Sequence, residues 1–300
     1  IKVDNSGLTL SSLKAHLENV PVNGTAKVFF RGNRTKIEAD LSTGGIAINR
    51  YFPISNDALP KNTSLSSPVA RPGSGRLATK TDLKDLADFS PGRWPTIPVD
   101  LYFLENFDAN IRLRSKALAH GNYSVNNSLL EATVVNGVLQ VNKLSGELFG
   151  GTINATATAK ATSPLTIESV VSLNNLILEK GLLAAIGESP AKGQAGLKIK
   201  LATSGYTVSD LVASLRGSGS INLKNINVSR GGEGTTFSSV LGLLSELKNI
   251  GGRLSGSNSN TGLANITGTF NVSKGIAESG DLLLVSSMGN GLAQGKIDLS

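Results

Sequence analysis

The stretch Thr152-Ile-Asn-Ala-Thr-Ala-Thr-Ala-Lys-Ala161 decides the fold that this sequence predicts. An apolar residue stands at every second position from Ile153 to Ala161, and polar residues fill the positions between. A period of two places successive side chains on opposite faces of a β-strand, whereas a helix needs a period near 3.6. We therefore expect a strand with one apolar and one wet face, which is typical of antiparallel sheet.

The same alternation recurs along the chain. In Asn110–Lys116, Ile111 and Leu113 stand opposite two arginines, and Gly196–Thr203 repeats the pattern with lysines between its apolar residues. Near the C-terminus, Ile266, Phe270 and Val272 share a face. Asn23-Gly24, Gly32-Asn33 and Gly44-Gly45 are typical of hairpin turns, and we expect turns there.

The composition favours many short strands over a helical bundle. The chain of 300 residues has 34 glycines, and a glycine inside a helix costs roughly 1 kcal/mol. Aromatic residues make up only 5% of the chain, with one Trp. Several predicted strand faces consist of Ala and Gly, so they would form a shallow, smooth surface rather than the bulky core of a sandwich.

The periodicity divides the chain into three parts. Residues 1–55 read as a β repeat, 56–96 as a flexible Pro- and Ser-rich insertion or linker, and 97–300 as a long β region. A short helix capped by Thr81 or Asp82 is predicted at Thr81–Phe89. Three others are predicted at Leu176–Ile186, Val208–Leu215 and Phe237–Ile250, where apolar residues follow a helical spacing. We interpret them as covers packed on a sheet.

No catalytic motif stands out. The chain has no cysteine, which excludes disulfides and thiolate chemistry, and its two histidines, His16 and His120, are far apart in sequence. The Ser-x-x-Lys matches at Ser11 and Ser245 lack their companion motifs, and no phosphate-binding glycine motif occurs. We expect neither an enzyme nor a cofactor or metal.

The net charge of +7 is spread along the chain. No basic run or aromatic platform predicts nucleic-acid binding. A weakly basic surface suits an anionic membrane surface or lipid head groups, and it equally suits a protein kept soluble by its charge. No apolar run reaches 18 residues. Because the chain begins at Ile1, we expect its targeting segment to be missing.

The order of motifs after residue 97 resembles the C-terminal part of AsmA family proteins. It starts with Asp108-Ala-Asn-Ile-Arg-Leu-Arg114 and continues with Val135-Asn-Gly-Val-Leu139 and Leu144-Ser-Gly-Glu-Leu-Phe-Gly-Gly-Thr-Ile153. Leu215-Arg-Gly-Ser-Gly-Ser-Ile-Asn-Leu223 and the closing Ala293-Gln-Gly-Lys-Ile-Asp-Leu299 are also similar to the family. Residues 1–54 resemble a preceding repeat, and the 56–96 insertion departs from the pattern.

The resemblance implies an elongated, strongly curved antiparallel β sheet that forms a hydrophobic groove, with a few short covering helices. It also implies a periplasmic protein of a Gram-negative bacterium, anchored in the inner membrane by an N-terminal segment absent from this chain. Its partners would be phospholipid or a lipopolysaccharide-related lipid, the membrane surface and outer-membrane assembly proteins. The groove candidates are the apolar strand residues Ile111, Leu113, Ile153, Ala155, Ala157, Ala159, Leu197, Ile199, Leu201, Ile221, Leu223, Ile266, Phe270 and Val272.

Two other functions fit the same pattern. A structural β-solenoid or adhesin-like stalk would turn these faces into a closed, dry core that binds no lipid. A scaffold for outer-membrane protein assembly would instead use a free sheet edge for strand addition.

Overall fold

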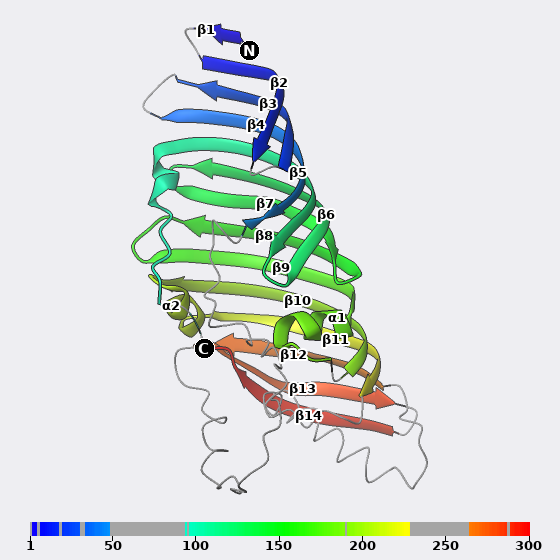
Figure 1. Cartoon of the computed structure of the whole chain (residues 1–300). Helices are drawn as coiled ribbons and strands as arrows, with labels where there is room; N and C mark the ends of the chain where they lie inside the picture. Colours follow the sequence, from blue (N-terminus) through cyan, green and yellow to red (C-terminus); the bar gives the residue numbers. More distant parts are fainter. Residues whose placement is uncertain are drawn as a thin grey trace, which may run out of the picture.

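A single β sheet of 14 strands makes up most of the protein, and its strands lie side by side in the order of the chain. The computed structural model describes residues 2–4, 7–17, 20–30, 34–48, 94, 96–189, 191–228, 264–286 and 289–300. Figure 1 shows an open, elongated stack of bent strands, with β1 at one end and β14 at the other. The predicted mainly-β, strongly curved sheet is confirmed.

The strands are long for a globular protein, most of them with 10 to 15 residues. The first four are β1 (Lys2–Asp4), β2 (Gly7–Leu17), β3 (Val20–Phe29) and β4 (Thr35–Ala47). The next five are β5 (Phe107–His120), β6 (Tyr123–Val135), β7 (Val138–Leu148), β8 (Gly151–Lys160) and β9 (Leu165–Ile177). The last five are β10 (Ala191–Gly205), β11 (Arg216–Val228), β12 (Ala264–Ser273), β13 (Ile276–Ser286) and β14 (Gly289–Asp298).

Tight hairpins join several neighbouring strands. Asn136-Gly137, Phe149-Gly150 and Lys274-Gly275 all have positive φ at both residues, as a two-residue hairpin of the right twist requires. Two of the predicted turns are wrong, because Asn23-Gly24 lies inside β3 and Gly44-Gly45 inside β4. Position 24 requires glycine because β4 approaches it closely: a Cβ there would lie 2.1 Å from the carbonyl oxygen of Asp40.

One pair of strands departs from the predicted antiparallel sheet. β4 and β5 are parallel, with Thr35 opposite Phe107 and Ala47 opposite Ala119, while the other neighbouring pairs are antiparallel. Parallel neighbours need a long crossover connection, and the chain between Ala47 and Phe107 provides it. The first four strands therefore continue the same sheet as the later ones.

Two of the predicted helices lie at opposite ends of β10. The helix α1 (Leu178–Ile186) begins two residues later than predicted, because Leu176 and Ile177 still belong to β9. The helix α2 (Val208–Ala213) is close to its prediction. The predicted helices Thr81–Phe89 and Phe237–Ile250 lie outside the described residues, as does almost all of the predicted 56–96 insertion.

A short segment before β5 runs along the rim where α2 lies. The indole nitrogen of Trp94 donates to the carbonyl oxygen of Leu299 at 2.6 Å, and the backbone nitrogen of Val99 donates to Tyr206 at 2.9 Å. The 3-10 helix η3 (Tyr102–Asn106) follows and buries Leu104 against Ala109 and Val134. The segment that precedes β5 therefore lies along this rim of the sheet (Figure 1).

Near the opposite rim, β-bulges bend several strands. Asn127, Asn175 and Asn225 adopt the left-handed conformation inside β6, β9 and β11, each next to a shift in register. Asn tolerates this conformation better than other side chains do, and a bulge increases local twist and bends its strand. These positions help to curl the sheet.

Candidate functional site

One face of the sheet is apolar along nearly its whole length. A continuous row of paired residues crosses the sheet from β2 to β14 through Ala157, and Ser169 is its one polar member. The row consists of Leu10, Ala26, Ala39, Ile111, Ala132, Val141, Ala157, Ser169, Leu201, Gly217, Val272, Ala277 and Ile297.

The next row on the same face is equally apolar. The row through Ala155 crosses the sheet through Leu13, Gly24, Leu41, Leu113, Leu130, Leu144, Ala155, Val171, Ile199, Gly219 and Phe270. All fourteen predicted groove residues lie on this one face. Twelve are in these rows or in the neighbouring rows through Ile153 and Ala159, and Leu223 and Ile266 are in the next row, which continues through Ala195 and Leu176. We call it the apolar face, defined by the rows through Ile153, Ala155, Ala157 and Ala159.

The structure adds residues that the sequence analysis did not select. Leu41, Leu130, Leu144, Val171 and Leu173 lie on the apolar face beside the predicted set. The bulges in β6 and β7 interrupt the alternation around Leu130 and Leu144 and hide their common face. In β9 the alternation from Ile167 to Leu173 was present in the sequence and could have been used.

Side chains on the apolar face are less exposed than those on the other face, most of all where η3 packs on it. Val134 and Val135 are neighbours of the same type, yet Val134 on the apolar face is 3% exposed and Val135 is 52% exposed. Phe270 covers a gap in the same face, since its ring lies over Gly219, where a Cβ would come within 2.4 Å of it. The face is therefore smooth and lined by Ala, Gly and aliphatic side chains.

Three buried hydroxyl groups interrupt the apolar face near one rim. Thr43, Ser115 and Ser128 stand opposite one another on β4, β5 and β6 and are 3–7% exposed. The hydroxyl of Ser115 donates to the carbonyl oxygen of Gly44 at 2.6 Å. The hydroxyl of Thr43 is buried without a hydrogen-bond partner among the described residues, which marks a polar position on an otherwise apolar surface.

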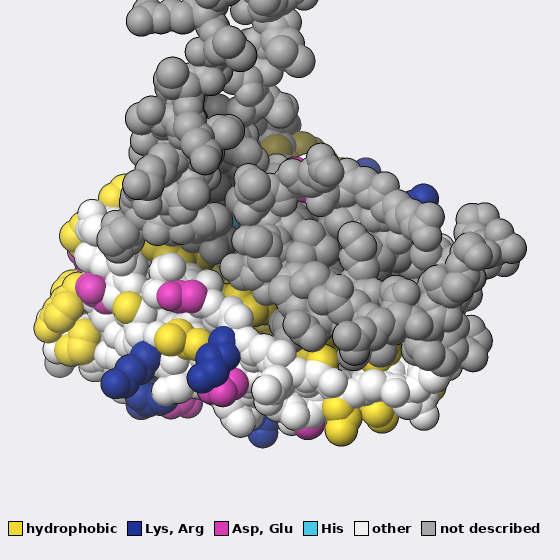
Figure 2. Space-filling model, turned by 90° about the horizontal axis from the view of Figure 1, so that it is seen from below, with side chains coloured by type: hydrophobic (Ala, Val, Ile, Leu, Met, Phe, Trp, Pro, Cys, Tyr) yellow, Lys and Arg dark blue, Asp and Glu magenta, His cyan; other side chains and the backbone are white. Residues whose placement is uncertain are grey.

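The opposite face is mainly polar, apart from exposed apolar side chains such as Val170, Leu283 and Leu292, and part of it carries cross-strand ion pairs. Arg114 bonds Asp40 at 2.6 Å between β4 and β5, Arg112 reaches Glu131 at 3.3 Å, and Lys296 reaches Glu278 at 3.0 Å. Figure 2, seen from below, shows acidic and basic side chains next to one another on the visible surface. Pairs this exposed stabilise a fold by less than about 1 kcal/mol each.

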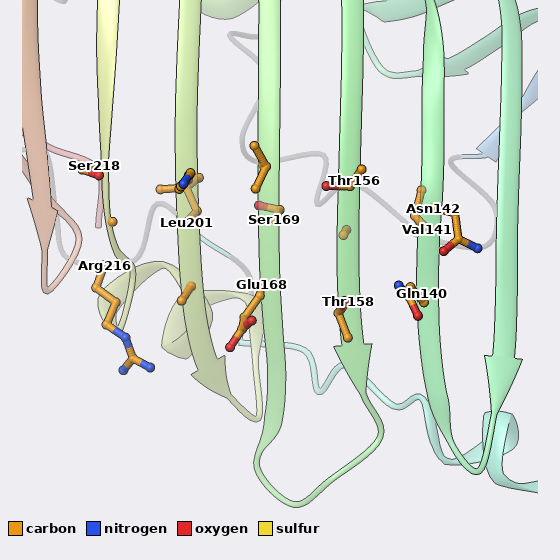
Figure 3. Close-up of a pocket in the computed structure, with 15 residues that line it drawn as sticks. Gln140, Val141, Asn142, Thr156, Thr158, Glu168, Ser169, Leu201, Arg216 and Ser218 are labelled. Carbon is orange, nitrogen blue, oxygen red and sulfur yellow. The ribbon is translucent and has the colours of Figure 1, made fainter.

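Two open hollows lie on the polar face. The larger, about 670 Å³, is lined by residues of β7 to β11, including Gln140, Thr158, Glu168 and Arg216 (Figure 3). Three consecutive residues of each strand line it, including members of the central row such as Ala157 and Leu201. The apolar rows through Ala155 and Ala159 contribute none, so we assign the hollow to the polar face. The smaller, about 330 Å³, is lined by residues of β9, β10 and β11 such as Asn174, Lys198 and Lys224.

The order of strands and the motifs on them agree with a known family. The sequence model of the AsmA family matches residues 1–282. The chain belongs to the AsmA family. This match confirms the resemblance seen in the motifs. The family is associated with the bacterial envelope, and membership is consistent with a role in lipid transport or outer-membrane assembly. No match was found among curated proteins or among solved structures.

Two features are absent from the residues that the structure describes. No helix among them is long and apolar enough to cross a bilayer. No group of three or more His, Cys, Asp or Glu side chains within the described ranges is placed to hold a metal ion.

Proposed function

We propose that this AsmA family protein shields the acyl chains of phospholipid on its apolar face and so carries lipid between the inner and outer membranes. The observation that supports this proposal is the apolar face itself, which crosses thirteen strands with one polar member in its central row. In this proposal the protein is not an enzyme, resides in the periplasm and is anchored in the inner membrane.

The energetics favour such a surface without any chemistry. A diacyl lipid exposes roughly 30 methylenes at about 0.8 kcal/mol each, so carrying it unshielded through water costs on the order of 20 kcal/mol. An apolar strip that stays continuous from strand to strand removes this cost at every step. Small side chains such as Ala155 and Ala157 leave room for the chains above the sheet.

The length of the sheet also fits. Fourteen strands spaced at about 4.8 Å span roughly 60 Å, which exceeds the thickness of one bilayer, about 40 Å, only modestly. The segment would serve as part of a longer conduit. Because the strands are stacked in chain order, the apolar rows, which cross the strands, run along the length of this conduit.

Lipid analysis of the purified protein tests the proposal. We expect native mass spectrometry after extraction in mild detergent to find glycerophospholipid bound at a sub-stoichiometric to several-fold ratio. A protein that carries no acyl species under these conditions would support the closed β-solenoid instead. As a control, the protein is expressed with and without a labelled lipid precursor. Bound lipid from the cells then carries the label, and species introduced with the detergent do not.

A second candidate function is assistance in outer-membrane protein assembly by strand addition. The observation that favours it is the open edge of the described sheet at β14, where backbone groups face away from β13. Charge reversal along this edge would weaken binding of an assembling β-strand and leave the lipid content unchanged.

A further inference from the structure

The polar face has an uneven distribution of charge. The strands β8 to β12 contain six basic residues and one acidic residue, Glu168, out of a chain with net charge +7. The basic residues are Lys160, Lys192, Lys198, Lys200, Arg216 and Lys224. On these five neighbouring strands the basic residues thus outnumber the acidic ones by five.

Several basic residues of other strands form ion pairs that these six lack. Basic residues of β5 and β14 form ion pairs with Asp40, Glu131 and Glu278. Within the part of the chain that the structure describes, none of the six basic residues of β8 to β12 forms an ion pair. All six residues are exposed.

Register brings the cations of β10 and β11 onto a single surface. Lys198 and Lys200 stand opposite Ser220 and Ser218, and Lys224 stands opposite Gln194, so small or polar neighbours leave the ammonium groups accessible. Lys200 and Arg216 line the larger hollow of the polar face, and Lys198 and Lys224 line the smaller one. Residues two apart on a strand are about 7 Å apart, which is close to the Debye length of about 8 Å at physiological salt. Their fields therefore add.

We propose that this basic surface, defined by Lys198, Lys200, Arg216 and Lys224, docks the protein on a membrane that contains anionic phospholipid. A bilayer surface presents phosphate charge continuously and attracts clustered Lys and Arg side chains without a shaped pocket. The two hollows are shallow and open, which suits head groups lying against a surface better than one enclosed ligand. The inference does not depend on lipid carriage, because it concerns the opposite face of the sheet.

Vesicle flotation with two matched variants tests this proposal. One variant is Lys198→Gln with Lys200→Gln, and the other is Lys14→Gln with Lys27→Gln on the exposed polar positions of β2 and β3. Both lower the net charge by two. We expect the wild-type protein to bind vesicles of phosphatidylglycerol and phosphatidylcholine at 100 mM salt and to ignore pure phosphatidylcholine. The first variant should bind at least about tenfold more weakly, and the second should change by less than about twofold.

Equal losses in the two variants would overturn the proposal, because they would indicate attraction by net charge alone. Absence of wild-type binding to the anionic vesicles, or equal binding to both kinds of vesicle, would also overturn it. Circular dichroism checks that both variants are folded. Lipid that copurifies with the protein should be unchanged in the first variant, so failure of docking and failure of lipid carriage are measured separately.

Discussion

Arg34 and Asp108 form an ion pair, with the Nε and Oδ1 atoms 3.0 Å apart, across the parallel junction of β4 and β5. The same guanidinium donates to the carbonyl oxygens of Leu104 and Phe107 at 3.2 and 3.0 Å. Asp108 also accepts from the backbone nitrogen of Asn136 at 3.1 Å. One side chain thus ties the start of β4 to η3 and β5.

We predict that Arg34→Ala lowers the free energy of unfolding by about 1–2 kcal/mol, since three hydrogen bonds from a half-buried charge are lost. Arg112→Ala, which removes a single exposed pair with Glu131, should cost less than about 1 kcal/mol. Chemical denaturation of both variants measures the difference. Equal losses would show that the junction does not depend on Arg34.

Ala157→Asp is predicted to block lipid transfer while the sheet stays folded. Ala157 lies in the centre of the apolar face, and a carboxylate there would have to lose water as an acyl chain passes, at several kcal/mol. Thr156→Asp places the same charge one residue earlier on the polar face and should transfer lipid normally.

Circular dichroism melting and a fluorescent-lipid transfer assay on both variants measure this effect. If Ala157→Asp unfolds the protein, the apolar face is a closed core that cannot hold a charge. Normal transfer by a folded Ala157→Asp protein would show that Ala157 does not line the lipid path.

Gly217→Ala should destabilise the pairing of β10 and β11. A Cβ at Gly217 would lie 2.0 Å from the carbonyl oxygen of Lys200, so one of the two strands has to move, at about 1–3 kcal/mol. Gly280→Ala is the control, because no atom lies within 4 Å of the added Cβ. Its stability should stay equal or rise slightly, since Ala restricts the unfolded chain. Thermal melting of both variants gives the comparison.

The cap of α2 is predicted to depend on pH. The Thr207 hydroxyl, followed by the backbone nitrogens of Thr207 and Tyr206, lowers the pKa of Asp210 below its ordinary value of 3.8. A pKa that is lower in the folded state stabilises the helix above pH 3.8, and this stabilisation is lost as pH falls through the lowered pKa.

Hydrogen exchange of the α2 amides between pH 3 and pH 6 measures this dependence. In the wild-type protein, protection relative to the intrinsic exchange rate should fall at the acidic end. Asp210→Asn should remove that dependence, and protection in this variant that still falls in the same way would contradict the role of Asp210.

The alternation of residue types was enough to predict the strands and their faces. A side chain in a strand points to one of two sides, so Ile153 to Ala161 and Leu197 to Leu201 could be assigned to an apolar face without knowing any neighbour. The short helix at Val208 was also predictable, because its cap and its apolar spacing are local.

Local patterns failed where contact with another strand decides the outcome. Asn23-Gly24 has the composition of a turn, but it lies inside β3 because β4 approaches it closely. Nothing within β4 or β5 shows that they pair in parallel, since the partner is chosen after a connection of some sixty residues. Leu130 and Leu144 were missed because bulges shift the alternation that would have revealed them.

By itself, therefore, the sequence determined which residues are apolar on each strand and which family the motifs resemble. Only the tertiary structure decided that these residues line up in unbroken rows across the sheet, and that Lys198, Lys200, Arg216 and Lys224 gather on its other side. The physical reason is that the direction of a side chain follows from its own backbone, whereas its neighbours depend on the register between strands far apart in the chain.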